Sequence, residues 1–229
     1  MRPPGRPKGE TRSALHEGTA MNSGRERVLA DIRRALGRDG PDVAAIPPLP
    51  GAGPRPAFEG ELVERFAAKM IEKSATLERI ASLADVGEAV ARFVSAHGAA
   101  QRLCVSPALA AVAWPPGITI HVGAAGRDEQ TSVTPCFAAV AEAGAVITLS
   151  GPNTPSTLNF VPENHIVVVR ADQVVRHFED AWAQWRASGL TMPRTLNVIS
   201  GPSRTADIEQ TIQLGAHGPR RLHILLVSA

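Results

Sequence analysis

The sequence contains no tyrosine, and aromatic residues make up only 4% of its 229 residues. Proteins that bind single-stranded nucleic acid commonly stack the bases on aromatic side chains. The formal net charge of +2 also lacks the basic excess with which proteins neutralise a phosphate backbone. We therefore expect no nucleic-acid partner.

Cysteine is scarce as well, since Cys104 and Cys136 are the only two, and each lies beside an apolar run. They cannot supply the four thiolates of an iron–sulfur cluster, and their separation does not match a zinc motif. No pair among the seven histidines has the spacing of a metal site, and no cysteine or carboxylate joins them at such a spacing. The sequence thus predicts no metal site, and two reduced thiols in or near the core.

Long apolar runs are also lacking, and the N-terminus has no apolar segment typical of a signal peptide. We therefore expect a cytoplasmic protein without a membrane span. Lysine occurs three times, as Lys8, Lys69 and Lys73, and none of these lies in the loops considered below. Their positions argue against Schiff-base chemistry and against a phosphate loop with its lysine.

The first 57 residues differ in pattern from the rest. Residues 1–20 are rich in Pro, Gly and Arg and have almost nothing to bury, so we expect a disordered extension. Residues 21–57 combine an amphipathic helix, ending at Gly37, with a Pro-rich linker that tethers it. The folded domain is therefore predicted at residues 58–229.

Within that domain, short apolar segments alternate with amphipathic ones. The predicted strands are residues 77–82, 103–105, 118–122, 131–134, 145–149, 165–169, 195–199 and 222–227. The predicted helices are residues 59–73, 86–97, 137–142, 172–187 and a short one that starts at Asp207 and ends at Gly215. This alternation predicts an α/β fold with a mostly parallel sheet and helices on both faces.

Two polar loops follow predicted strands, one starting at Ser150 and one at Ser200. Ligands bind at the carboxyl ends of strands in α/β sheets, and helix N-termini attract anions. We therefore predict a pocket for an anion or small molecule between these loops. Its predicted lining residues are Ser150, Gly151, Thr157, Asn159, His165, Ser200, Gly201, Ser203, Arg204, Thr205, His217 and Gly218. The alternative is a set of surface turns with a solvated arginine, because no complete phosphate-loop motif is present.

Three carboxylates near these loops are catalytic candidates. Glu142 precedes a glycine turn, where a carboxylate can act as a nucleophile or base. Asp207 and Glu209 form a close acidic pair after Arg204, and such a pair can divide the roles of acid and base. The alternatives are a solvated helix end for Glu142, helix capping for Asp207 and solvation for Glu209.

Several longer stretches resemble a known family. They are Ala141–Ala145, Ser150–Pro152, Thr157–Pro162, His165–Val169, Ile199–Gln210 and Leu214–Pro219. Together they span residues 131–227 and resemble the lactate-utilisation protein C family, whose conserved region is called the LUD domain. The chain departs from that family's common Glu-Thr-Gly turn, because Ala143 follows Glu142, and it has Ala145 where threonine is frequent.

The resemblance implies a fold similar to formyltetrahydrofolate cyclo-ligase and to the ribose-phosphate isomerase and CoA-transferase-like sheets. It also implies a component of an L-lactate utilisation system, taking part in oxidation of L-lactate to pyruvate beside iron–sulfur partner subunits. We expect this chain to be a non-redox subunit that binds no cofactor itself, with the clusters on its partners and a small carboxylate or phosphorylated ligand in the pocket. Two alternatives stay open: a free-standing transferase or ligase that uses Glu142 or Asp207, and a non-catalytic scaffold.

Overall fold

The computed structural model describes residues 19–37, 53–205 and 213–228. The chain divides into two compact units, Met1–Gly53 and Pro54–Ala229. Across these described ranges, no helix is both long enough and apolar enough to pass through a bilayer.

The described part of the first unit is the helix α1 (Thr19–Ala35). Gly37 follows it in the left-handed conformation, with φ at +63°, which ends the helix as the sequence predicts. The apolar side chains of Val28, Ile32 and Leu36 are exposed. The helix therefore presents an apolar stripe, at the positions that the sequence pattern predicts.

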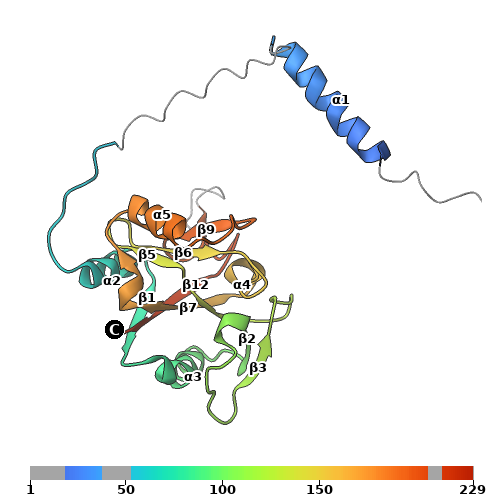
Figure 1. Ribbon diagram of the computed structural model, residues 1–229. Coiled ribbons are helices and arrows are strands. Elements are labelled where there is room, and N and C mark those ends of the chain that lie inside the picture. Colours follow the sequence, from blue (N-terminus) through green and yellow to red (C-terminus); the bar gives the residue numbers. More distant parts are fainter. Residues whose placement is uncertain (1–18, 38–52, 206–212, 229) are drawn as a thin grey trace, which may run out of the picture. The chain divides into compact units, whose positions relative to one another are not determined.

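Six parallel strands form the central sheet of the second unit (Figure 1). In spatial order they are β1 (Thr76–Ile80), β12 (Arg221–Val227), β7 (Asn164–Arg170), β4 (Thr131–Pro135), β2 (Arg102–Val105) and β3 (Thr119–Val122). The central strands β7 and β12 pair over seven residues, and nearly every residue in them is buried. Strands covered on both faces are rich in apolar residues on consecutive positions, as residues 166–169 and 224–227 are in these two strands. The predicted parallel α/β sheet is confirmed.

A second sheet, which the sequence pattern does not predict, packs against the first. Its strands in spatial order are β8 (Val174–Val175), β5 (Ala138–Val140), β6 (Ala145–Leu149) and β9 (Leu196–Ile199). The strand β6 runs antiparallel to both β5 and β9. The domain therefore contains a parallel sheet and a smaller mixed sheet.

Two predicted helices are corrected by this second sheet. Residues 137–142 contain strand β5 rather than a helix, and the segment predicted as a helix from Asp172 begins with a 3₁₀ turn, η3 (Ala171–Gln173), and strand β8. Alanine favours helices locally, but Ala138 and Ala139 are fully buried on opposite faces of β5. Small side chains let β5 lie close to layers on both sides, so packing overrides propensity.

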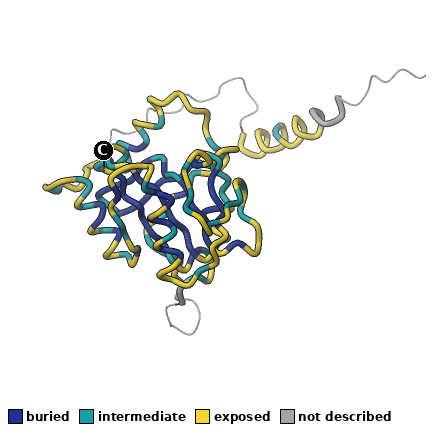
Figure 2. Tube along the Cα trace, turned by 90° about the horizontal axis from the view of Figure 1, so that it is seen from below, coloured by how far each residue is buried: buried dark blue, intermediate teal, exposed yellow. Residues whose placement is uncertain are grey.

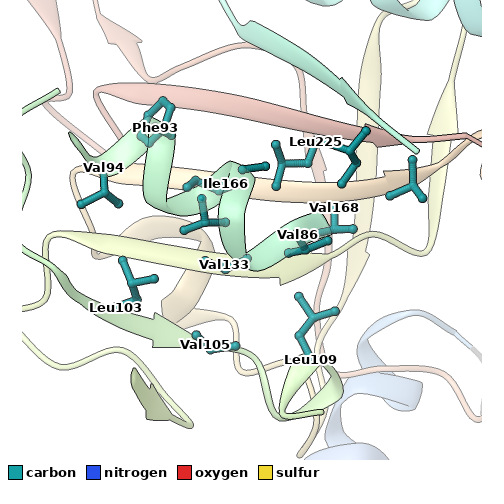
Figure 3. Packing of buried hydrophobic residues seen from close by; sticks show 14 residues of the cluster. Val86, Phe93, Val94, Leu103, Val105, Leu109, Val133, Ile166, Val168 and Leu225 are labelled. Carbon is teal, nitrogen blue, oxygen red and sulfur yellow. The ribbon is translucent and has the colours of Figure 1, made fainter. Parts of the chain in front are cut away.

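Helices cover the outer faces of the two sheets. The remaining helices are α2 (Leu62–Glu72), α3 (Val86–Ala96), α4 (Thr157–Phe160) and α5 (Phe178–Ala187), with 3₁₀ turns η1 (Leu83–Asp85) and η2 (Pro107–Leu109). Side chains of α3 meet those of β2, β4, β7 and β12 in one apolar core (Figure 3). On the other face of the central sheet, α2 and the second sheet form another core. Buried residues accordingly follow the strands in the interior of the domain (Figure 2).

The predicted helix from Asp207 lies mostly outside the described residues. On either side of the gap, β10 (Arg204–Thr205) and β11 (Gln213–Leu214) form a short antiparallel pair. The last residues assigned to that helix are thus a strand, and the helical prediction is wrong there. Gly215 follows with φ at +83°, and its amide donates a hydrogen bond to the Ser203 carbonyl at 2.9 Å.

Candidate functional site

Most of the predicted lining residues are divided among separate cavities and do not surround a single one. The first, named here the Ser203 cavity, has a volume of about 230 Å³ and lies between α4, the loop after β9 and the loop before β12. Seven predicted residues line it: Asn159, His165, Ser200, Gly201, Ser203, His217 and Gly218. The two loops singled out around Ser200 and His217 thus face one space.

The second, named here the Ser150 cavity, has a volume of about 330 Å³. Ser150 and Gly151 line it, together with Pro135 and Cys136 at the carboxyl end of β4. Neither Ser150 nor Gly151 lines the Ser203 cavity. The expected pairing of the Ser150 rim with the Ser200 rim is therefore corrected.

The Ser203 cavity lies at the amino ends of the central strands, not at their carboxyl ends as predicted. His165 and Leu222, which line it, are the second residues of β7 and β12. The expectation was wrong because β9, the strand before Ser200, belongs to the second sheet. The carboxyl end of β9 lies beside the amino ends of β7 and β12, which no local sequence pattern indicates.

His165 gives this cavity a buried polar group. Its side chain is fully buried, and Nε2 lies 2.8 Å from Thr134 Oγ1. Among the described residues, its Nδ1 has no hydrogen-bond partner. Burial lowers the pKa of His165 to about 3, so the ring is neutral at pH 7. A buried polar atom without a partner is uncommon in folded proteins, and His165 is one of the residues that line this cavity.

Hydrogen bonds join the two loops that form the cavity wall. The Ser203 amide donates to the Pro219 carbonyl at 2.9 Å, and the His217 amide donates to Ser203 Oγ at 3.3 Å. Since Ser203 Oγ accepts there, its own hydroxyl proton can be donated elsewhere. Ser200 Oγ donates to the Gly144 carbonyl at 2.7 Å, so this hydroxyl anchors the loop to the turn between β5 and β6.

This region lies in the part of the chain that resembles known proteins. Residues 128–227 match the LUD domain, a range that contains every residue lining the Ser203 cavity. Over 212 residues, the chain is 30% identical to a lactate utilization protein C of Deinococcus radiodurans, which covers 87% of this chain and 93% of that protein. The chain belongs to the lactate utilization protein C family. The resemblance seen in the sequence is thereby confirmed.

Two further similarities extend the comparison. A lactate utilization protein C of Bacillus subtilis is 33% identical over 107 residues, which are 44% of this chain and 45% of that protein. The crystal structure of a DUF162 family protein from Deinococcus radiodurans has a TM-score of 0.56 and 24% sequence identity to this chain. The match covers 75% of this chain and 99% of the Deinococcus chain, and this similarity supports the fold alone.

Gly201 fixes the position of the cavity wall against α2. Its φ is +95°, and a Cβ at this position would lie 2.6 Å from the Lys73 carbonyl oxygen. Gly201→Ala should therefore reduce the free energy of unfolding by about 1–3 kcal/mol, because it adds a backbone clash to an unfavourable dihedral angle. Urea unfolding measures this loss.

The matched control is Gly189→Ala. Gly189 also has a positive φ, +67°, but a Cβ there meets nothing within 4 Å. In this variant the free energy of unfolding should fall only by the cost of placing a Cβ at positive φ, about 1 kcal/mol. Equal losses in both variants would contradict a close contact between the Gly201 loop and α2.

Other predicted ligand residues form internal contacts. The side-chain nitrogen Nδ2 of Asn159 donates a hydrogen bond to Thr148 Oγ1 at 2.9 Å inside the protein, and this bond holds α4 against β6. Thr157 Oγ1 accepts from the Ala125 amide at 2.9 Å. The exposed Arg204 donates from Nη2 to the Lys73 carbonyl at 2.7 Å and does not line the Ser203 cavity. Of Thr205, the structure describes only its place in β10, and Asp207 and Glu209 lie outside the described residues.

Glu142 lies between β5 and β6 rather than at the end of a helix, because the predicted helix before it is a strand. Its Oε2 is 2.6 Å from His177 Nδ1, and its Oε1 accepts from the Phe178 amide at 3.1 Å. Both groups belong to the start of α5, where backbone N–H groups need acceptors. In the structure, Glu142 thus fixes the N-terminus of α5, and it lines neither the Ser203 nor the Ser150 cavity.

A further group of side chains, which the spacing of residues along the sequence does not indicate, comes together in the structure. Cys104 on β2, His121 on β3 and Glu129 in the loop before β4 bring their ligand atoms within 4.8 Å of one another. The expectation that no cysteine or carboxylate joins a histidine is therefore wrong. One signal was available: strands that follow each other in a chain usually pair, and both strands were predicted. The register places Cys104 beside His121, which spacing along the sequence does not reveal.

Burial and hydrogen bonding set the protonation of this cluster. Burial, followed by the nearby Glu129 carboxylate, raises the pKa of Cys104 to about 12. Burial also acts to raise the pKa of Glu129, but hydrogen bonds from the Gly126 amide, His121 and Cys104 outweigh it and leave that pKa below its ordinary value. In the absence of a bound cation, the cluster thus contains a thiol and a carboxylate at pH 7.

Proposed function

We propose that this chain is a component of an L-lactate utilisation system and takes part in the oxidation of L-lactate to pyruvate with iron–sulfur partner subunits. Membership of the lactate utilization protein C family supports this role. The chain's two cysteines are too few for a four-thiolate cluster. Electron transfer would therefore belong to the partners, and this subunit would serve a non-redox step.

Within that system, we propose that the Ser203 cavity binds a small carboxylate or phosphorylated ligand. The observation that carries this is that three polar side chains, Ser203, His217 and the buried His165, line one cavity of about 230 Å³. In the tautomer in which His165 Nε2 accepts from Thr134, the proton is on Nδ1, which has no partner among the described residues. The Ser203 hydroxyl would be a second donor, and the nearby Arg204 would add positive potential.

Growth on L-lactate tests this proposal. In a strain that lacks the chain and fails to grow on L-lactate, the wild-type gene should restore growth. The double variant Ser203→Ala/His217→Ala should restore it poorly, because it removes a hydroxyl donor and an imidazole from the cavity wall. One charge-assisted hydrogen bond contributes about 1.5–3 kcal/mol, so ligand affinity should fall roughly tenfold to a hundredfold.

The matched control is Ser95→Ala/His97→Ala, the same pair of substitutions at exposed positions at the end of α3. It should restore growth fully, although it loses the 2.8 Å contact between His97 Nδ1 and the Phe93 carbonyl, and the cavity variant should unfold at a urea concentration no lower than that of this control. Normal growth of the cavity variant would contradict ligand binding at this site. The exposed apolar stripe of α1 favours the scaffold alternative. A chain that needs residues 19–37 but tolerates the cavity variant would support it.

A further inference from the structure

Three side chains of types that can bind a metal ion converge at one edge of the central sheet. The strands β2 and β3, drawn in green, form this edge (Figure 1). Cys104 and His121 are direct neighbours in the parallel register, so their side chains point to the same face. That face is opposite to the α3 core, because the adjacent residues Leu103 and Val105 belong to that core. Glu129 reaches the same point from the loop between β3 and β4.

The distances suit a single small cation. Cys104 Sγ lies 3.7 Å from His121 Nδ1. Bond lengths of about 2.3 Å to sulfur and about 2.0 Å to nitrogen, at tetrahedral angles, place these two atoms about 3.6 Å apart around zinc. His121 Nδ1 is 2.6 Å from Glu129 Oε1. A cation in place of the shared proton would separate this pair to about 3.3 Å, and the half-exposed His121 ring can make that shift.

The arrangement differs from that of a catalytic triad. In a triad, the nucleophile and the acid contact different nitrogens of the imidazole ring. Here the thiol and the carboxylate both approach Nδ1 of His121. Three donor atoms around one point are the arrangement of metal ligands instead.

The surroundings hold the donors in place. Glu129 Oε2 accepts from the Gly126 amide at 2.6 Å, which leaves Oε1 for the shared point. The Cys104 side chain is fully buried and that of Glu129 nearly so, whereas the His121 side chain is 43% exposed. Hydrogen bonds such as the one from the Gly126 amide orient metal ligands. The exposed side of the His121 ring offers an entry path for the ion.

We propose that Cys104, His121 and Glu129 bind one zinc ion, with the fourth position open to water or to a small ligand. One thiolate, one imidazole and one carboxylate are donors that zinc accepts, and the sulfur disfavours magnesium and calcium. Their charges, with the thiol deprotonated, balance a divalent ion. Three protein ligands with an open position are typical of catalytic zinc sites rather than of structural ones.

Metal titration of the full-length, chelator-treated protein tests the proposal. The wild type should bind one equivalent of Zn²⁺ by calorimetry and show a higher melting temperature with the metal. Co²⁺ should give a thiolate charge-transfer absorption and the intense visible bands of a tetrahedral site. In Cys104→Ala the charge-transfer absorption should be lost. Cys136→Ala, which removes the other buried thiol, should leave it unchanged.

The double variant His121→Gln/Glu129→Gln keeps the test valid if Cys104→Ala does not fold. Loss of outer contacts alone weakens metal binding by about tenfold to a hundredfold, so loss of two direct ligands should weaken it by at least about a hundredfold. The proposal is overturned if the wild type takes up no Zn²⁺, or if the double variant binds it as tightly as the wild type. It is equally overturned if the cobalt absorption is lost in Cys136→Ala and kept in Cys104→Ala.

Discussion

Acidification from about pH 8 to about pH 5 should reduce the free energy of unfolding by about 4 kcal/mol, well before most carboxylates are protonated. Two buried histidines are the cause. Burial lowers the pKa of His165 to about 3 and that of His223 to about 4, from an ordinary value of 6.5. At pH 5 each contributes about 2 kcal/mol of this loss.

The direction follows from proton binding. Between pH 6.5 and about 4, the unfolded chain protonates both histidines, whereas the folded chain keeps them neutral. The unfolded state therefore binds more protons, and stability falls as the pH falls. Above pH 6.5 both states are neutral at these positions, so the effect disappears there.

Urea unfolding at a series of pH values measures this dependence. His223→Gln should remove about half of it, because its ring is one of the two groups. His217→Gln, at an exposed position, should leave the slope unchanged. An unfolding free energy that stays constant between pH 8 and pH 5 would contradict the buried neutral state of both rings.

The central sheet could be predicted from the sequence because its strands are buried on both faces. The segments that became β7 and β12 each contain an apolar run of four residues, 166–169 and 224–227, and such runs predict buried parallel strands without knowledge of their neighbours. Strand β5 could not be predicted from the sequence, because Ala138 and Ala139 favour a helix locally. Its strand conformation depends on two layers that lie on either side of it, which are distant in the sequence.

Part of the lining of the Ser203 cavity was predictable from the sequence, but the arrangement of the predicted residues was not. The loops around Ser200 and His217 carry turn residues, and such loops commonly bind ligands. That they face the amino ends of β7 and β12, and not the loop at Ser150, depends on the second sheet. The cluster at Cys104 depends on strand pairing in the same way. Local pattern selects residues, whereas sheet order decides which of them meet.

Phe66→Ala should reduce the free energy of unfolding by about 3–5 kcal/mol, the usual loss for a fully buried phenylalanine. Phe66 on α2 has no exposed surface. It belongs to the same buried cluster as Val167 of the central sheet and Val146 of the second sheet. Removal of the ring would leave a cavity between helix and sheets, at the place where the two layers and α2 come together. Urea unfolding measures the loss.

Ile71→Ala is the matched control on the same helix. Ile71 lies on the same helix as Phe66, but it is 58% exposed. It should therefore cost less than about 0.5 kcal/mol, as surface substitutions usually do. If Ile71→Ala lost as much as Phe66→Ala, the helix would be rotated from its described position. Because the end of α2 contacts the Gly201 loop, that rotation would also displace the wall of the Ser203 cavity.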